Sequence, residues 1–356
     1  MTTHSRHIGK RLRRNKGALF GLIVISLSIL TAIFAYFLAP DGSPDANRII
    51  VEIGGRSPGF RQRFLLLRKP RQPAAPGFFH RLLFGREDRY DYIPVNSYTV
   101  KGDSMIVQKY VDEDVEERRA YSLTAIAPGQ TKTITFWLGT DKYGRDILSR
   151  LLIGVRVSLA VGLVTVLLSL GVGVPLGALA GYFRGRVDEI ILWLINVIWS
   201  IPTLLLVFAI MLLLGKGFWQ VFIAIGLTLW VNVARIVRGQ VLAIREREFV
   251  EAARSLGYSH SRILFRHILP NVMGPVWVVA ASNFASAIVI EAGLSFLGVG
   301  VQPPQPSWGL MIKENYNFII THNPMLALAP GLAIMLLVLA FNLLGNSLRD
   351  ILNVRV

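Results

Sequence analysis

Very few side chains in this sequence have the types and spacing that catalysis or ligand binding requires. Cysteine is absent from the 356 residues, which excludes thiol nucleophiles, thiolate zinc sites and iron–sulfur clusters. The Gly-Lys pairs at 9–10 and 215–216 are followed by Arg11 and Gly217, whereas a phosphate-binding loop has Ser or Thr there. The His-Glu-x-x-His and Gly-x-Ser-x-Gly patterns of hydrolases are also missing. We therefore predict no catalytic residue, no metal site and no bound cofactor, and any ATP must be handled by another chain.

The stretch 246–270 has instead the pattern of two short helices separated by a stop. Glu and Ala favour a first helix, Gly257 accommodates the left-handed conformation that ends helices, and Ser259 is placed to cap the second. Arg262 and Arg266 lie one turn apart on the second helix, away from a partial apolar stripe. A short helix of this kind inserts into a groove of a partner, and Gly257 lets the two backbones come close. We predict a docking surface, with an ordinary surface hairpin as the alternative.

The elements that must position this loop are strongly apolar. Hydrophobic residues make up 53% of the sequence, which indicates that lipid is the main solvent. The net charge of +16 would suit a nucleic-acid binder if it were gathered on one compact face. Many Lys and Arg residues lie instead in short stretches between long apolar runs. We therefore expect contact with membrane lipid and none with nucleic acid.

Six apolar runs are long enough to cross a hydrocarbon core of about 30 Å, since a helix rises about 1.5 Å per residue. The first, 18–39, follows a basic amino-terminal segment at 1–17. A cleaved signal peptide is the alternative for this run, but signal apolar regions are only about 7 to 15 residues long. The other predicted spans are 157–182, 190–214, 218–236, 272–297 and 325–345.

The distribution of charge favours six spans with both termini in the cytoplasm. We expect the chain to lie in the inner membrane. Arginine gathers in the connections that this count places inside, above all at 237–271, whereas the short outer connections hold only Lys216 and Lys313. One span more or fewer would put the Arg-rich loop outside, against the positive-inside bias. The orienting residues are Arg6, Lys10, Arg11, Arg13, Arg14, Lys16, Arg184, Arg186, Arg238, Arg245, Arg247, Arg254, Arg262, Arg266, Arg349 and Arg355.

Residues 40–137 interrupt the apolar pattern with a polar, Pro-rich and charged stretch that is too long for a simple connection. We predict a small extracytoplasmic α+β domain inserted into an all-α polytopic membrane protein, whose core, with five of the six spans, is 138–356. Gly102 and Asp103 are expected in a turn of this insertion. The predicted strands are 97–100, 105–109 and 131–136, and the predicted helix is 78–84.

Polar side chains inside the predicted spans are candidates for a translocation pathway. Glu291 falls late in the fifth span, where an ionised carboxylate in lipid is costly, so such residues usually face a pathway or a partner. A paired carboxylate near the outer interface explains Glu291 equally well. Asn283 and Asn342 line the same pathway or form interhelical hydrogen bonds. Close helix packing is predicted at Gly171, Gly173 and Gly177, kinks at Pro175 and Pro202, and an interfacial anchor at Trp308.

Four stretches of the sequence contain recognisable motifs. Glu251-Ala252-Ala253, three further residues, Gly257 and later Leu269-Pro270 resemble the signature loop of importer-type ABC permeases. His267 is a departure, because the general pattern has Ile two residues before the Leu. The resemblance covers the first span and most of 136–356, and misses 41–135. Peptide-permease motifs are similar to Gly-Thr-Asp-Lys-Tyr-Gly-Arg-Asp at 139–146, Glu-Ala-Gly-Leu-Ser-Phe-Leu-Gly-Val-Gly-Val-Gln-Pro-Pro-Gln-Pro-Ser-Trp-Gly at 291–309 and Asn-Leu-Leu-Gly-Asn-Ser-Leu-Arg-Asp at 342–350.

This resemblance implies the importer-type ABC permease fold and a transmembrane subunit of an ATP-driven peptide importer. It implies a heterodimer with a second permease, two ATP-binding cassette subunits that hold ATP and Mg²⁺, and an extracytoplasmic substrate-binding protein. Nickel or another small solute is the alternative cargo. A gradient-driven secondary carrier and a membrane-anchored signalling scaffold are the rival classes, and neither requires the loop to bind an ATPase. The ATPase-coupling residues implied are Glu251, Ala252, Ala253, Gly257, Tyr258, Ser259, Leu269 and Pro270.

Overall fold

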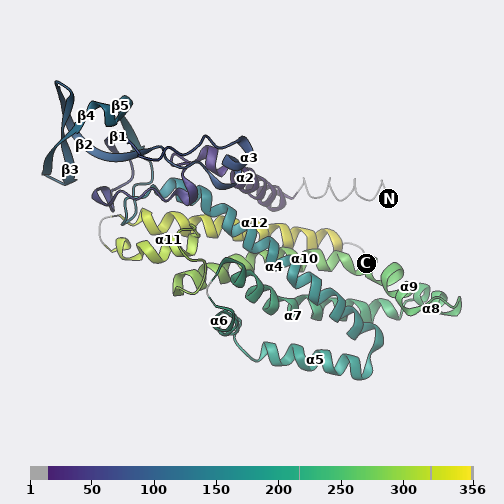
Figure 1. The fold of residues 1–356 in the computed structure, drawn as a ribbon. Helices are drawn as coiled ribbons and strands as arrows, with labels where there is room; N and C mark the ends of the chain where they lie inside the picture. Colours follow the sequence, from purple (N-terminus) through teal and green to yellow (C-terminus); the bar gives the residue numbers. More distant parts are fainter. Residues whose placement is uncertain (1–14, 216, 321–322, 354–356) are drawn as a thin grey trace. The chain divides into compact units, whose positions relative to one another are not determined.

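The computed structural model describes residues 15–215, 217–320 and 323–353, in which long apolar helices accompany one small sheet (Figure 1). The chain forms two compact units made of interleaved segments. The first comprises Met1–Ser28, Ser158–Gln302 and Ile334–Val356, and the second comprises Ile29–Val157 and Pro303–Ala333. The orienting residues Arg6, Lys10, Arg11, Arg13, Arg14 and Arg355 lie outside the described residues, as does Lys216 of an outer connection.

Five of the described helices are long and apolar enough to cross a membrane. The predicted span 190–214 is a broken one: α5 (Gly185–Trp199) and α6 (Thr203–Leu214) are bent by 92° relative to each other. Pro202 precedes α6, and its missing amide interrupts the helical hydrogen bonds, whereas Pro175 lies inside α4. The described part therefore holds five candidate spans, or six if the bent pair crosses as one. The five are α2 (Lys16–Leu38), α4 (Ile147–Phe183), α7 (Phe218–Arg245), α10 (Leu269–Leu297) and α12 (Met325–Asn353).

In the first unit a row of glycines on α4 brings this helix close to α7. A Cβ atom added at Gly173, Gly177 or Gly181 would lie 2.6, 2.4 or 2.8 Å from a carbonyl oxygen of α7. Close packing at Gly173 and Gly177 is thus confirmed, and Gly181 extends the row by one turn. At Gly171 an added Cβ meets nothing within 4 Å, so the prediction of close packing there is wrong.

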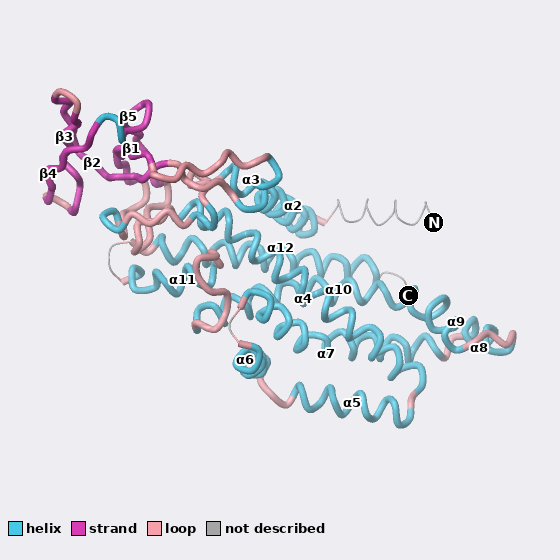
Figure 2. Tube along the Cα trace, viewed as in Figure 1, coloured by secondary structure: helices cyan, strands magenta, loops and turns pink. Residues whose placement is uncertain are grey.

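The second unit contains a five-stranded antiparallel sheet with the strand order β4-β3-β2-β1-β5 (Figure 2). Phe64 and Leu65 are neighbours on β1, so their side chains point to opposite faces, and each belongs to a separate apolar cluster. The predicted strands and helix are confirmed, including a turn with Gly102 at a φ of +58°, while β1 and β4 were not predicted. The elements are β1 (Phe60–Arg68), α3 (Phe78–Phe84), β2 (Tyr90–Lys101), β3 (Ser104–Asp112), β4 (Val115–Ser122) and β5 (Ile126–Phe136).

Trp308 begins α11 (Trp308–Asn315), a short helix of the second unit. Its side chain is only 3% exposed, and its indole nitrogen donates to the Leu151 carbonyl of α4 at 3.0 Å. An added Cβ at Gly154 would lie 2.8 Å from the indole ring, so this glycine makes room for it. The interpretation of Trp308 as an interfacial anchor is therefore wrong, since its ring is a buried packing element between α11 and α4.

Candidate functional site

The loop between α7 and α10 is a helical hairpin, as the sequence predicts. Its first helix, α8 (Glu248–Ser255), ends in a Schellman motif at Gly257, whose φ is +76°. The Tyr258 amide donates to the Ala253 carbonyl at 3.2 Å, and the Gly257 amide donates to the Arg254 carbonyl at 2.9 Å. Glycine takes this backbone conformation without strain, so Gly257 is the residue that permits the turn.

The second helix begins where it was predicted but is capped differently. After α9 (His260–Arg262) the chain forms a π-helical turn, η4 (Ile263–Ile268), and continues directly into α10. Ser259 occupies the N-cap position with an extended backbone, yet its hydroxyl makes no capping hydrogen bond to a backbone amide. Ser259 therefore lies at the predicted N-cap position, but the predicted capping hydrogen bond is not formed. π-Helical turns are frequent at functional sites.

One side of the hairpin is anchored in the core of the first unit. Val250 and Ala253 of α8 are buried together with Ile263 and Ile268 of η4. The same apolar cluster continues through residues of α4, α7 and α10. A displacement of the hairpin must therefore move these helices or break the cluster, because packed interiors have little free volume.

The opposite side of the hairpin faces away from the rest of the unit. Glu251 and Ala252 are exposed, and an added Cβ at Gly257 would meet nothing within 4 Å. Large apolar side chains left exposed on one short element are typical of a surface that binds another protein. The large apolar side chains exposed here are Phe249, Leu256 and Phe265, at 45%, 71% and 69%.

The remaining predicted coupling residues lie at the end of the hairpin that meets α10. Tyr258 is half-buried and stacks on the His267 ring, with ring centroids 5.8 Å apart, and the Arg262 guanidinium lies 4.1 Å above Tyr258. Leu269 is half-buried, and Pro270 is exposed in the first turn of α10, where its missing amide costs no helical hydrogen bond. The structure thus brings the predicted loop residues together in one compact element.

A cleft of about 720 Å³ opens in the first unit between residues of α5, α7, α10 and α12. Asn283 lies at its wall, where its side-chain amide donates to the Leu229 carbonyl at 3.2 Å. Asn232 Nδ2 donates to the side-chain oxygen Oδ1 of Asn283 at 3.5 Å, and the Arg235 guanidinium lies 4.4 Å above the Trp199 ring. The lining residues are Trp199, Asn232, Arg235, Ile236, Gly239, Gln240, Pro275, Val278, Val279, Ser282, Asn283 and Arg349.

Glu291 and Asn342 do not line this cleft. Glu291 is 1% exposed, and its Oε1 accepts a hydrogen bond of 2.6 Å from the Ser295 hydroxyl, which in turn accepts from the Val301 amide at 3.0 Å. Asn342 is exposed on α12. Of the three predicted pathway residues, only Asn283 combines an interhelical hydrogen bond with a position at a cavity wall.

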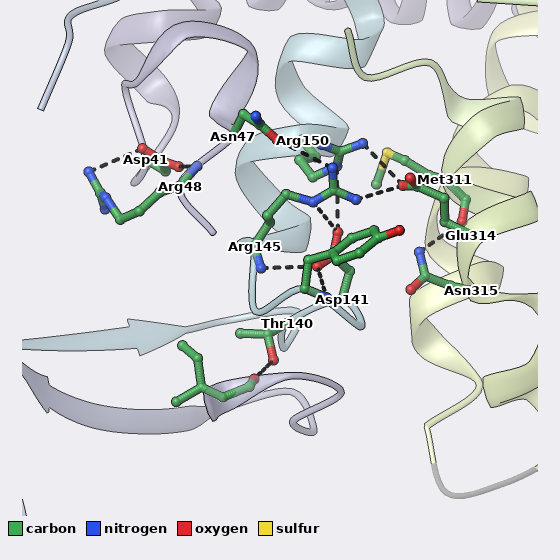
Figure 3. A network of polar contacts seen from close by, with 12 residues as sticks. Asp41, Asn47, Arg48, Thr140, Asp141, Arg145, Arg150, Met311, Glu314 and Asn315 are labelled. Carbon is green, nitrogen blue, oxygen red and sulfur yellow. Dashed lines mark hydrogen bonds and ion pairs between the residues drawn. The ribbon is translucent and has the colours of Figure 1, made fainter. Parts of the chain in front are cut away.

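A buried cluster of four charges in the second unit was not predicted as a unit (Figure 3). Arg145 Nε donates to Asp141 Oδ2 at 2.6 Å, and Arg145 Nη2 donates to Glu314 Oε2 at 2.7 Å. Arg150 Nη2 lies 3.4 Å from the same Glu314 oxygen, and its Nε lies 3.9 Å from Asp141 Oδ2. Exposure of the four side chains is 10% or less. Two guanidiniums and two carboxylates balance one another and connect the segment at 139–150 to α11.

The turn that carries Asp141 is built by its own carboxylate. Asp141 Oδ1 accepts from the amides of Tyr143 and Arg145 at 2.9 and 3.0 Å, which fixes the peptide ahead of α4. Nearby, burial raises the pKa of Asp146, although hydrogen bonds from Ser149 oppose this shift. The ion pairs and hydrogen bonds make this turn a brace to α11, although Asp146 Oδ1 and Arg150 Nε and Nη1 are buried with no hydrogen-bond partner among the described residues. The partner of these arginines that was not predicted is Glu314. Its one signal in the sequence is that it is the single acidic residue of α11.

Comparisons with known proteins match both ends of the chain. The family model described as binding-protein-dependent transport system inner membrane component matches residues 173–356. A second model, the N-terminal TM domain of oligopeptide transport permease C, matches residues 5–49. Neither match includes 50–172, the stretch that holds the sheet.

Several curated proteins are similar over 217 residues. The chain is 43% identical to the glutathione transport system permease protein of Pectobacterium atrosepticum, covering 61% of this chain and 72% of that protein. It is 41% identical to the oligopeptide transport system permease protein of Bacillus subtilis, and 42% identical to the dipeptide transport system permease protein of Alkalihalophilus pseudofirmus. Each of these two matches covers 61% of this chain and 71% of the other protein. A solved inward-facing structure of the MetNI methionine ABC transporter matches 58% of this chain and 97% of its own, with a TM-score of 0.49 and 19% identity.

Proposed function

We propose that this chain is the permease subunit of an ATP-driven peptide importer. The chain belongs to the family of binding-protein-dependent transport system inner membrane components. The related proteins transport glutathione, oligopeptides and dipeptides according to their names, and this supports a peptide as the cargo. The observation that carries the proposal is the hairpin of α8 and η4, which exposes apolar side chains while its other side is locked into the helices around it.

We assign the hairpin to docking on an ATP-hydrolysing subunit. Phe249, Leu256 and Phe265 would fill a groove of that partner, and Gly257 would let the two backbones approach because nothing lies beyond its Cα atom. Glu248 and Glu251 stand in the first turn of α8, where the helix dipole stabilises negative charge. The coupling surface that we propose comprises Glu251, Ala252, Ala253, Gly257, Tyr258, Ser259, Leu269 and Pro270.

The membrane topology that we propose has six spans, with the bent pair α5 and α6 acting as one. In this arrangement residues 1–17 and the carboxyl end lie in the cytoplasm, together with the loop at 237–271, and 40–137 lies outside the inner membrane. The positive-inside bias supports this orientation, because the hairpin and its flanks carry the Arg-rich connection. Fusing a reporter that is active only in the cytoplasm after residues 215 and 257 tests it, since only the second fusion should be active.

A complete transporter of this kind requires further subunits, because the chain has no phosphate-binding loop. We propose a heterodimer with a second permease, two ATP-binding cassette subunits and an extracytoplasmic binding protein. The cleft with Asn283 would then form half of the pathway, closed on the other side by the second permease. For Glu291 the paired carboxylate is the better interpretation, since its hydrogen-bonded oxygen is buried away from the cleft.

Copurification tests the docking role directly. The tagged chain is expressed with its neighbouring subunits, purified in mild detergent and compared with the variant that carries Leu256→Asp and Phe265→Asp. We expect the native chain to bring down ATPase subunits and the variant to lose them, while the second permease stays bound. Val115→Asp, an exposed apolar residue of β4, is the matched control. Retention of the ATPases by the double variant would contradict the docking role.

Uptake measurements distinguish the candidate cargoes. Proteoliposomes of the whole transporter are supplied with labelled dipeptides, oligopeptides or Ni²⁺, with ATP inside and the binding protein outside. Peptide uptake that stops without ATP supports the proposal. Uptake of Ni²⁺ alone would assign the metal as cargo, and uptake driven by an ion gradient without ATP would favour a secondary carrier.

A further inference from the structure

The short helix α3 lies beside the carboxyl end of α2 in the second unit. The rings of Phe78 and Phe37 are 5.6 Å apart, and the Arg81 guanidinium lies 4.4 Å above the Phe37 ring. An added Cβ at Gly85, directly after α3, would lie 2.9 Å from the ring of Tyr36. These close contacts place α3 against the last turn of α2.

This helix buries none of its seven residues. A helix of this length is not stable in water by itself, so its neighbours must hold it. Arg156 of α4 does so, since its Nη1 donates to the carbonyl oxygens of Leu82 and Leu83 at 3.3 and 3.0 Å. These carbonyls lie at the negative end of the helix dipole, where a cation is favourable. The exposed large side chains are Phe78, Phe79, Leu83 and Phe84, at 60%, 76%, 51% and 59%.

The exposed face of α3 continues the apolar surface of α2. Near its carboxyl end α2 exposes Leu30, Phe34 and Leu38, at 52%, 42% and 55%, and a spanning helix turns such side chains toward lipid. Contact between Phe37 and Phe78 joins the two helices at the level where the span ends. Aromatic side chains are enriched at that level, the interface between acyl chains and headgroups.

Charge around α3 suits phospholipid headgroups. The stretch 68–89 has six Lys and Arg residues against two acidic ones, and one of the acids, Asp88, is paired with Arg48 at 2.7 Å. Exposed aromatic and leucine side chains around most of a short helix, with arginines beside it, suit a segment that lies in the membrane interface. The basic residues are Arg68, Lys69, Arg71, Arg81, Arg86 and Arg89.

We propose that α3 is a membrane anchor that inserts Phe78, Phe79, Leu83 and Phe84 into the lipid interface at the end of α2. The neighbouring arginines would bind lipid phosphates. This contact would tie the insertion at 40–137 to the bilayer at a point of its own, in addition to the spans at its two ends. Membrane lipid is the occupant that the continuity with α2 favours over a protein.

The absence of cysteine makes the test direct, because any introduced cysteine is the only thiol. Leu83→Cys and Val115→Cys are labelled with an environment-sensitive fluorophore in the full-length chain and reconstituted with its partner subunits. The two sites are matched, since both native side chains are 51% exposed. Vesicles of phosphatidylcholine and phosphatidylglycerol carry nitroxide lipids as membrane quenchers, and iodide is the aqueous quencher.

We expect nitroxide lipids to quench the label at position 83 several-fold more than the label at 115, with the opposite order for iodide. Equal behaviour of the two labels would overturn the proposal. The proposal would also be overturned if iodide quenched the label at 83 and addition of the binding protein abolished this quenching. That result would show that a protein covers this face of α3. Phe79→Cys provides a second position, 76% exposed in the native chain, should Leu83→Cys disturb the carbonyls that Arg156 binds.

Discussion

Removing the charge of Glu314 is the most informative perturbation of the buried cluster. Its Oε2 lies 2.7 Å from Arg145 Nη2 and 3.4 Å from Arg150 Nη2. With an effective dielectric constant of about 20, Coulomb's law gives roughly 5–6 kcal/mol of attraction for each pair before desolvation is counted. Desolvation offsets much of this attraction in the native chain. In Glu314→Gln, however, the two guanidiniums keep Asp141 as their only ion-pair partner among the described residues, and leaving a buried charge uncompensated costs about 3–5 kcal/mol.

Hydrogen exchange with mass spectrometry on the detergent-solubilised chain measures this cost locally. We expect the opening of the peptides that cover 139–150 and 308–315 to become easier by about 3–5 kcal/mol. Because 1.4 kcal/mol corresponds to a factor of ten, this amounts to a loss of protection of roughly a hundred- to several thousand-fold. Peptides of the α8 hairpin, which belongs to the first unit, should keep their protection.

Two further variants decide whether burial is the cause. Glu117→Gln removes an equally close partner of Arg119, 2.9 Å away, but both of these side chains are about half exposed, so protection should hardly change. Adding Arg150→Met to Glu314→Gln makes the cluster neutral again and should restore most of the lost protection. If Glu314→Gln changed protection no more than Glu117→Gln does, the argument for a charge-balanced brace would be refuted.

The remaining predictions concern helix packing and pH. Gly177→Leu should destabilise the chain by about 1–3 kcal/mol in thermal unfolding, because a Cβ there meets the Ala234 carbonyl at 2.4 Å. Gly171→Leu should be tolerated, because a Cβ there meets nothing within 4 Å. Similar stability of the two variants would contradict the close packing of α4 on α7. Burial raises the pKa of Glu52, but Lys109 at 2.7 Å outweighs it, and the net pKa is below the usual range. This ion pair therefore stabilises above the unfolded pKa of about 4.3, and the stability difference from Glu52→Gln should vanish as the pH falls through the native pKa.

Local patterns account for the parts of the fold that the sequence predicted. Alternation in β2, β3 and β5 and the helix at 78–84 were readable because period and turn residues are local properties. The stop at Gly257 was readable for the same reason, since a positive φ after a helix selects glycine. The bent pair at Pro202 was predicted only as a kink, because the angle depends on what the two apolar helices pack against.

Long-range pairing accounts for what was missed. Asp141 and Arg145 belong to a recognisable motif, but Glu314 stands more than 160 residues away, and no periodicity links them. Trp308 was misjudged because the space that accepts its ring is created by Gly154 on another helix. Glu291 and Asn283 lie on the same helix, yet only the folded chain shows which of them lies at the cleft.

The hairpin and the cleft are connected by one continuous set of packed side chains. Val250 and Ala253 of α8 share a cluster with Val272, Val276 and Val279 of α10, and Val279 also lines the cleft. Because a packed interior deforms little, we expect a force applied to the exposed side of the hairpin to reach the cleft wall through α10. The glycine row that seats α4 on α7 leaves those two helices little freedom to absorb the movement. If ATP-driven closure of a partner moves the hairpin, the wall that carries Asn283 must move with it. A transporter that couples a distant hydrolysis step to its pathway requires this linkage.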